Sequence, residues 1–109
     1  MRPRYIGSEI YRRSSYGPKH PLAVPRVSVC TDLVRAMGWL DERDFLEAPL
    51  AGDDLLLRFH TTEYVAALRR AEVEQAVSEV VRARHFLGAA GNPVFGEMFR
   101  RPATSAGGV

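Results

Sequence analysis

Three prolines, Pro18, Pro21 and Pro25, fall within eight residues and constrain this chain more than any other feature. Proline fixes φ, lacks a backbone N–H and restricts the residue before it, so no long helix can run through this stretch. A proline directly before a helical pattern suits a helix start, where its missing N–H has no intrahelical partner. We therefore expect a proline-bounded loop that leads into a helix beginning near Arg26.

The residues after Pro25 repeat apolar side chains at helical spacing. Gly38 is placed to end this helix, and Trp39 with Leu40 could fold back onto its apolar face. We expect that face to be buried and the thiol of Cys30 to be an inert part of it. The apolar positions are Val27, Cys30, Val34 and Met37, with Leu33 beside them.

A second and clearer helix is predicted over residues 62–81. Thr61 or Thr62 can cap it by accepting a backbone N–H, and Glu63 suits the first turn because of the helix dipole. Its apolar face is marked by Tyr64, Ala67, Leu68 and Ala71, and Arg70 and Glu74 are spaced to pair on another face.

The remaining segments give weaker patterns. Residues 4–7 and 45–49 are strand-like, and residues 8–19 indicate a loop or an irregular helix. Residues 55–59 are apolar enough to be buried, in a helix or a strand. Residues 82–92 indicate a loop and residues 93–101 a helix. Pro102 would either kink that helix or mark its first turn. Read alone, residues 103–109 look like a frayed end.

Composition limits the class of protein. A chain of 109 residues with 46% apolar residues suits one small globular domain, α/β or mostly helical. Fifteen Lys and Arg against thirteen Asp and Glu give a net charge of +2, too small to argue for nucleic acid as a partner. Cys30 is the single cysteine, which fits a reducing, cytoplasmic setting. No signal peptide or membrane span is evident, so we expect no membrane partner.

The sequence shows no complete catalytic or metal site. A catalytic zinc needs about three converging protein ligands and one open position. His20, His60 and His85 are far apart and lack any metal-ligand spacing, so no metal ligands are predicted in this chain. We interpret His60 as a hydrogen-bonded structural residue beside the capping threonine. The glycines at 88 and 91 lack the lysine and hydroxyl residue of a phosphate-binding loop.

Five motifs in a fixed order resemble the histone deacetylase and acetoin-utilisation deacetylase family, with bacterial acetoin-utilisation-like members most similar. They cover nearly the whole chain. The motifs are Tyr5-Ile6 with Ser8; Gly17-x-x-His20-Pro21-x-x-x-x-Arg26; Phe59-His60-Thr61-x-x-Tyr64-x-x-x-Leu68; Leu87-Gly88 through Asn92-Pro93-Val94-Phe95; and Ala103-x-x-Ala106-Gly107-Gly108.

The resemblance implies where this chain would meet a substrate. The loop containing His20 and Pro21 would lie near the substrate entrance, and Arg26 would line an internal channel, where a guanidinium can bind acetate in a bidentate way. The alternative is that Arg26 pairs with a buried acid or a carbonyl. Gly91 stands where the family often has an aspartate that holds the substrate backbone, and Asn92 could supply a weaker hydrogen bond.

The resemblance also implies that the catalytic and zinc-binding residues would come after Val109. We therefore expect residues 1–109 to form the N-terminal part of a single deacetylase-like domain, truncated before the zinc site. The fold would be α/β, a fragment of the three-layer arginase–deacetylase architecture, mostly helical with few short strands and with exposed apolar surface.

Three functions remain open at this point. The first is a segment of a zinc-dependent cytoplasmic hydrolase that removes acetyl or other acyl groups from acetylated lysine, polyamines or small amines. Such a segment would be inactive alone, with zinc present only in the full-length protein. The second is a non-catalytic product that associates with itself or with a complementary C-terminal segment through apolar faces. The third is a basic helical module for nucleic acid, which the low net charge disfavours.

Overall fold

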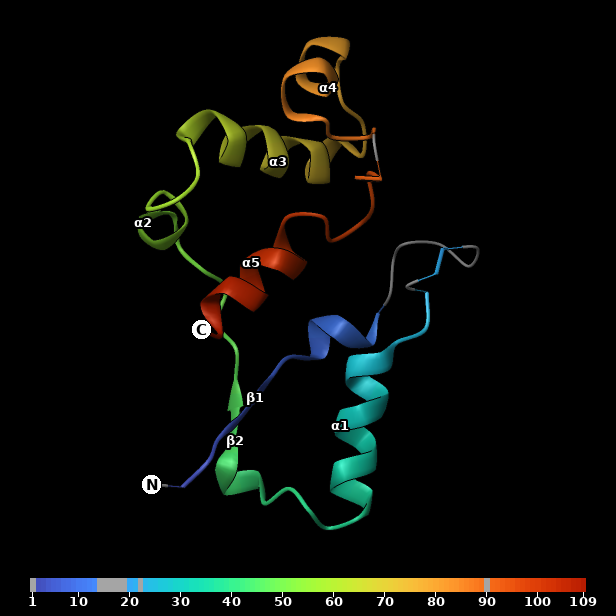
Figure 1. Cartoon of the computed structure of the whole chain (residues 1–109), viewed down its shortest axis with the longest axis vertical. Helices are drawn as coiled ribbons and strands as arrows, with labels where there is room; N and C mark the ends of the chain where they lie inside the picture. The colour runs from blue at the N-terminus through green and yellow to red at the C-terminus, as the bar shows by residue number, and fades with distance from the viewer. Residues whose placement is uncertain (1, 14–19, 22, 90) are drawn as a thin grey trace.

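The computed structural model describes residues 2–13, 20, 21, 23–89 and 91–109. The molecule is flat, with extents of 50 × 35 × 19 Å, and its two halves lie end to end along the longest axis (Figure 1). In chain order the elements are β1 (Tyr5–Gly7), η1 (Glu9–Arg12), α1 (Arg26–Ala36), η2 (Glu42–Asp44), β2 (Phe45–Glu47), α2 (Asp53–Leu56), α3 (Thr62–Glu74), α4 (Glu79–His85) and α5 (Arg100–Gly107).

The two predicted strands are confirmed, and they pair with each other. β1 and β2 form a parallel two-stranded sheet with Tyr5 opposite Phe45 and Gly7 opposite Glu47. Parallel strands need a crossover between them, and α1 lies in that crossover. Of the predicted loop or irregular helix over residues 8–19, the part through Arg12 is the 3-10 turn η1, and residues 14–19 lie outside the described residues.

Helix α1 begins and ends where the sequence predicts. Pro25 is its N-cap, and the chain leaves the helix through Gly38 at φ +70°, a left-handed conformation that glycine adopts without steric cost. The amide N of Trp39 then donates to the carbonyl of Val34 at 2.9 Å, which closes a glycine-containing helix end.

The predicted burial of α1 is wrong. Its buried residues are Ser28 and Thr31, whereas Val27, Cys30 and Leu33 are exposed, and the side chain of Trp39 is 71% exposed. The buried hydroxyl groups are hydrogen-bonded to the backbone around the start of their own helix: Ser28 donates to the Pro25 carbonyl (3.0 Å) and Thr31 donates to the Val27 carbonyl (2.9 Å). Because Val27, Cys30 and Leu33 are exposed, the apolar side of the helix faces solvent.

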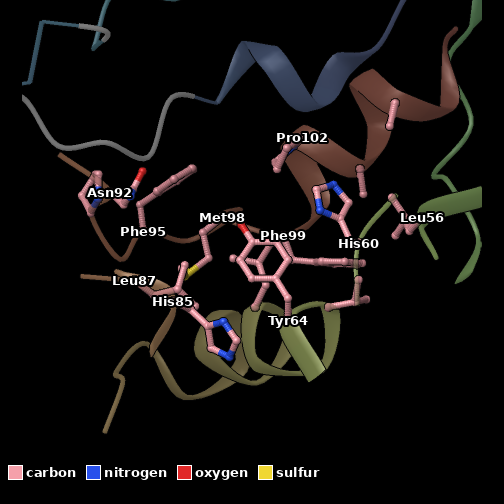
Figure 2. Close-up of a pocket in the computed structure, with 15 residues that line it drawn as sticks. Leu56, His60, Tyr64, His85, Leu87, Asn92, Phe95, Met98, Phe99 and Pro102 are labelled. Atoms are coloured by element: carbon pink, nitrogen blue, oxygen red, sulfur yellow. The ribbon is translucent and has the colours of Figure 1, made fainter. Parts of the chain in front are cut away.

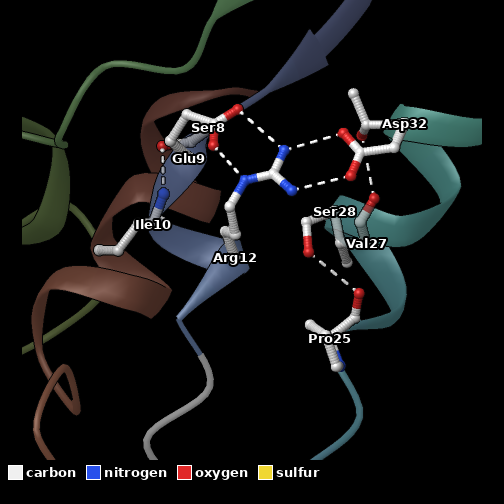
Figure 3. A network of polar contacts seen from close by, with 9 residues as sticks. Ser8, Glu9, Ile10, Arg12, Pro25, Val27, Ser28 and Asp32 are labelled. Carbon is white, nitrogen blue, oxygen red and sulfur yellow. Dashed lines mark hydrogen bonds and ion pairs between the residues drawn. The ribbon is translucent and has the colours of Figure 1, made fainter. Parts of the chain in front are cut away.

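An arginine joins η1 to α1 (Figure 3). The Arg12 guanidinium donates to both carboxylate oxygens of Asp32, at 2.8 and 2.9 Å, and its Nε donates to Glu9 at 2.6 Å. These hydrogen bonds hold the pKa of Asp32 and of Glu9 below their ordinary values and raise the pKa of Arg12. The Tyr5 hydroxyl and Thr31 Oγ1, 2.7 Å apart, tie β1 to the same helix.

The predicted helix over residues 62–81 is two helices. Thr61 caps α3 by accepting from the amide of Tyr64, as expected, but the helix ends at Gln75, whose φ is +52°. The Gln75 side chain donates to the Glu72 and Phe95 carbonyls and so holds this break. Ser78 then caps α4 by accepting from the amide of Val81.

Two further predictions near the helices are wrong. In residues 55–59 only Leu56 is buried, and the Phe59 side chain is 88% exposed. The helix expected over residues 93–101 starts later, at Arg100, and continues through the segment expected to fray. Pro102 lies in the first turn of α5, which is one of the two positions the sequence allowed.

The buried apolar side chains lie almost entirely in the second half of the chain. One cluster joins α2, α3 and α5, and the other lies between α3 and the segment before α5. The clusters are Ala51, Leu56, Val65, Phe99 and Ala103, and Ala71, Leu87 and Met98. No helix in the described ranges is both long and apolar enough to cross a bilayer.

Candidate functional site

Three of the five predicted site residues lie together. His20, Gly91 and Asn92 line one cavity of about 430 Å³, which we call the rim cavity, together with Pro93, Met98, Phe95, Pro102, Arg101 and Ser105. His20 reaches it from the proline-bounded loop, and Gly91 and Asn92 reach it from the loop after α4. Seventy residues separate them in the sequence, so their meeting depends on the fold.

Backbone hydrogen bonds close the loop that follows α4. The amide of Gly88 donates to the Asn92 carbonyl at 2.7 Å, and the amide of Asn92 donates to the Ala89 carbonyl at 2.9 Å. Gly91 has φ +82° with no atom within 4 Å of where a Cβ would be, so backbone conformation and not crowding favours glycine at this position. The Asn92 side-chain Nδ2 donates weakly to the Phe86 carbonyl at 3.4 Å, which leaves its Oδ1 as an acceptor.

Pro21 and Arg26 contact each other outside the rim cavity. The Arg26 guanidinium donates to the Pro21 carbonyl at 3.2 Å, and both residues are exposed. This carbonyl contact agrees with the structural alternative for Arg26. It does not occupy the whole guanidinium, which has five N–H donors, so binding of an anion by Arg26 stays a prediction.

Glu72 fixes the segment that forms one wall of the rim cavity. Its Oε2 accepts from the amides of Phe99 and Arg100, both at 2.8 Å, and its Oε1 accepts from Arg100 Nε at 2.7 Å. The carboxylate thus satisfies two free N–H groups at the start of α5. Sequence reasoning missed Glu72, because a glutamate inside a helical pattern gives no sign of a partner 27 residues away.

The histidines do not form a metal centre. His60 and His85 lie on either side of Tyr64, with ring centroids 5.3 and 5.5 Å from the Tyr64 ring, and His20 lies at the rim cavity. Among the residues that the structure describes, the His60 side chain makes ring contacts with Phe59 and Tyr64 and not the structural hydrogen bond we expected. Across the described ranges no three His, Cys, Asp or Glu side chains are grouped to hold a metal ion. The described residues therefore do not fit a zinc site.

Comparison with known proteins gives consistent matches in sequence. The chain is 32% identical over 93 residues to histone deacetylase 1 of Oryza sativa subsp. japonica, covering 85% of this chain and 18% of that protein. It is 27% identical over 105 residues to the acetoin utilization protein AcuC of Bacillus subtilis, covering 96% of this chain and 27% of that protein. No family model matches the chain.

The fold matches solved structures closely. Two crystal structures, one of a histone deacetylase homologue from Aquifex aeolicus and one of a histone deacetylase homologue complexed with SAHA, match with a TM-score of 0.92 and 32% identity. Each match covers 99% of this chain and 29% of the other chain. The chain thus spans less than a third of the length of the relatives it matches. The matches confirm the expected fold, part of the arginase–deacetylase architecture, mostly helical with two short strands.

Proposed function

We propose that this chain, whose sequence and fold are similar to part of histone deacetylase homologues, supplies outer helices and part of the substrate entrance of a deacetylase-like enzyme. The observation that carries the proposal is the superposition of 99% of this chain on a homologue whose structure contains SAHA. The reaction would remove an acetyl or related acyl group from an amine.

Within such an enzyme the rim cavity would meet the substrate. Its lining offers the side-chain carbonyl oxygen of Asn92, which suits a substrate with backbone or amine N–H groups, and His20 lies at the same cavity. Arg26 would bind a carboxylate product, for which a guanidinium is well shaped. No proton transfer or bond cleavage is assigned to any described residue, because these residues do not form a zinc site.

The substrate would be an acetylated lysine, a polyamine or a small acylated amine, and we propose a cytoplasmic, bacterial-type enzyme that uses zinc. The lone cysteine supports a reducing compartment. Nucleic acid is a poor candidate partner, because arginines that could contact phosphate pair with carboxylates of the chain, among them Arg69 with Asp53 and Arg70 with Glu74.

The second candidate is a non-catalytic role in which the chain associates through its apolar surface. The observation that favours it is the exposure of Val27 and Leu33 on α1 and of Met37 at its C-cap, at 44%, 55% and 53%, with Trp39 beyond the helix end. In an enzyme the complementary C-terminal part would cover this surface. In the non-catalytic role, a second copy of the chain or the same part without activity would cover it.

One mixing experiment separates these functions. The chain is combined with the C-terminal part of the Aquifex aeolicus homologue that its match leaves uncovered, and hydrolysis of an acetylated lysine peptide and bound zinc are measured. We expect each part to be inactive alone and the mixture to bind zinc and hydrolyse the peptide. A mixture that co-elutes without hydrolysis favours the non-catalytic role, and failure of the two parts to associate rejects the proposed complementation.

Variants of the active mixture then test the entrance residues. We expect Asn92→Ala to raise KM several-fold, since one hydrogen bond to the substrate is lost, and Arg26→Ala to slow product release or turnover. Arg70→Ala is a matched control, because Arg70 is an exposed arginine on α3 that pairs with Glu74. Unchanged kinetics in both entrance variants would remove these residues from the site.

A further inference from the structure

A second cavity lies beside the rim cavity, between α3 and α5 (Figure 2). Its volume is about 310 Å³. Tyr64 and Leu68 of α3 line one side, Pro102 and Ala106 of α5 line the other, and Phe95 and Met98 come from the segment between the helices. We call it the inter-helix cavity. Its walls are mostly apolar, as in sites that bind small organic molecules.

Four polar side chains, His60, Tyr64, His85 and Asn92, interrupt these apolar walls. His60 and His85 flank Tyr64, and all three line the cavity. Within residues 2–13, 20, 21, 23–89 and 91–109, neither the Tyr64 hydroxyl nor the His60 imidazole forms a hydrogen bond. The single polar contact of the His85 side chain in that part of the chain is with Glu63, 4.0 Å away. Donors and acceptors therefore remain for a bound molecule.

The charge of the lining decides the class of ligand. No Asp, Glu, Lys or Arg is among the described residues that line this cavity. A charged ligand would lose its hydration there without gaining an ion pair, which is strongly unfavourable. A neutral ligand with an apolar body and one hydrogen-bonding group loses far less.

The volume of the cavity limits the size of the apolar part of that ligand. A dry apolar cavity of about 150 Å³ holds a benzene molecule, so the larger volume of this cavity holds a substituted ring. We propose that the inter-helix cavity binds a small neutral phenol, with its ring among Phe95, Met98 and Leu68 and its hydroxyl bonded to Tyr64 or His60. This site goes beyond the deacetylase-like function proposed above and does not depend on it.

Occupancy of this cavity would bear on the rim cavity. Asn92, Pro93 and Phe95 line both cavities, so a molecule packed on one side of this wall limits the movement of the other side. A ligand held between α3 and α5 would therefore stabilise the segment that carries Asn92.

The test compares two ligands of nearly equal shape, p-cresol and p-xylene, by titration of the 109-residue chain followed by NMR. We expect both to bind, with p-cresol roughly three- to tenfold tighter because it gains one hydrogen bond. Intermolecular NOEs should connect p-cresol to Met98 and Phe95. The double variant Tyr64→Phe, His60→Leu should lose most of the preference for p-cresol, because the two expected partners of the hydroxyl are gone.

Filling the cavity should end binding. Ala106→Leu places a larger side chain in the α5 wall, and Ala66→Leu, on the exposed side of α3, is its matched control. We expect the first variant to lose both ligands and the second to bind them as before. If Ala106→Leu does not fold, the intermolecular NOEs from p-cresol show on their own whether the ligand lies in the cavity. No saturable binding, equal affinity of the two ligands for the unmodified chain, or NOEs to residues outside the cavity would overturn the proposal.

Discussion

The two halves of this molecule are stabilised in different ways. Residues 51–109 contain both buried apolar clusters, in which α3 and α5 contribute side chains from facing sides. In residues 2–50 the described structure buries one hydrophobic side chain, that of Ala48, together with the hydroxyl residues Ser28 and Thr31. Hydrogen bonds and ion pairs, such as Arg12 with Asp32 and Arg35 with Glu42, connect the elements of this first half instead.

The difference shows which half can keep its structure on its own. Apolar burial contributes about 25 cal/mol per Å², whereas exposed ion pairs contribute little to stability. The first half also exposes apolar side chains on α1 and on both strands, including Leu33, Ile6 and Leu46. It therefore has the properties of a surface that another unit covers, while the second half has the properties of a small core.

The largest expected effect comes from one close backbone contact between the halves. A Cβ on Gly107 of α5 would overlap the Pro49 carbonyl oxygen, which is backbone and cannot move aside cheaply. We expect Gly107→Ala to destabilise the chain by about 3 kcal/mol in urea unfolding. Gly52→Ala is the control, since its Cβ would meet only the flexible Asp54 side chain. Equal losses for the two variants would mean that this close contact does not join the halves.

A smaller effect is expected inside the helical half. Glu72→Ala leaves the amides of Phe99 and Arg100 without their acceptor, and the Glu72 side chain is only 12% exposed. We expect a loss of about 2 kcal/mol in the free energy of unfolding, as for hydrogen bonds to a charged group. Glu74→Ala, on the exposed side of the same helix, should be almost neutral. A neutral Glu72 variant would show that packing alone places α5.

Acid should weaken the ion pairs that join η1 to α1. The folded state lowers the pKa of Asp32 and of Glu9, because Arg12 donates hydrogen bonds to both. Their stabilising contribution is therefore complete above their unfolded pKa values, near about 4, and is lost as pH falls through the lower folded values. Amide exchange in η1 and α1 should accelerate in this range before exchange in the middle of α3. Asp32→Asn should remove most of this pH dependence, and simultaneous acceleration in both halves would contradict the distinction.

The smallest effect on stability is expected on the apolar side of α1. Leu33→Asn removes an apolar side chain that is 55% exposed, so the unfolding midpoint of the isolated chain should change little. Sedimentation should nevertheless show weaker association, with itself or with the complementary part. A large loss of stability would show that this side of α1 is already packed within the isolated chain.

The sequence predicted helix boundaries well where the capping residue and its hydrogen-bond partner are close in sequence. Gly38 and Thr61 end and start their helices as expected, because their interactions lie within a few residues. The break at Gln75 was missed, since it depends on the Phe95 carbonyl 20 residues away. The apolar side of α1 was correctly placed on one face, but periodicity cannot say whether a partner is present to bury it.

The role of the candidate site residues stays a prediction, although three of them meet in the fold. The resemblance placed His20, Gly91 and Asn92 at one entrance, and these residues share a cavity. Propensity and spacing could not have found the grouping of His60, Tyr64 and His85, because His85 is brought to the others by the turn at residues 75–78. Glu72 was missed for the same reason, since its partners lie at the start of another helix.

The parallel pairing of β1 with β2 also bears on the order in which the chain folds. Tyr5 meets Phe45 only after the intervening residues, α1 included, have been brought into a closed loop, and closing a long loop costs conformational entropy before any pairing is gained. Turns and caps in the helical half join residues close in sequence, so they can form early. Refolding should therefore form the α3 helix before the strands pair.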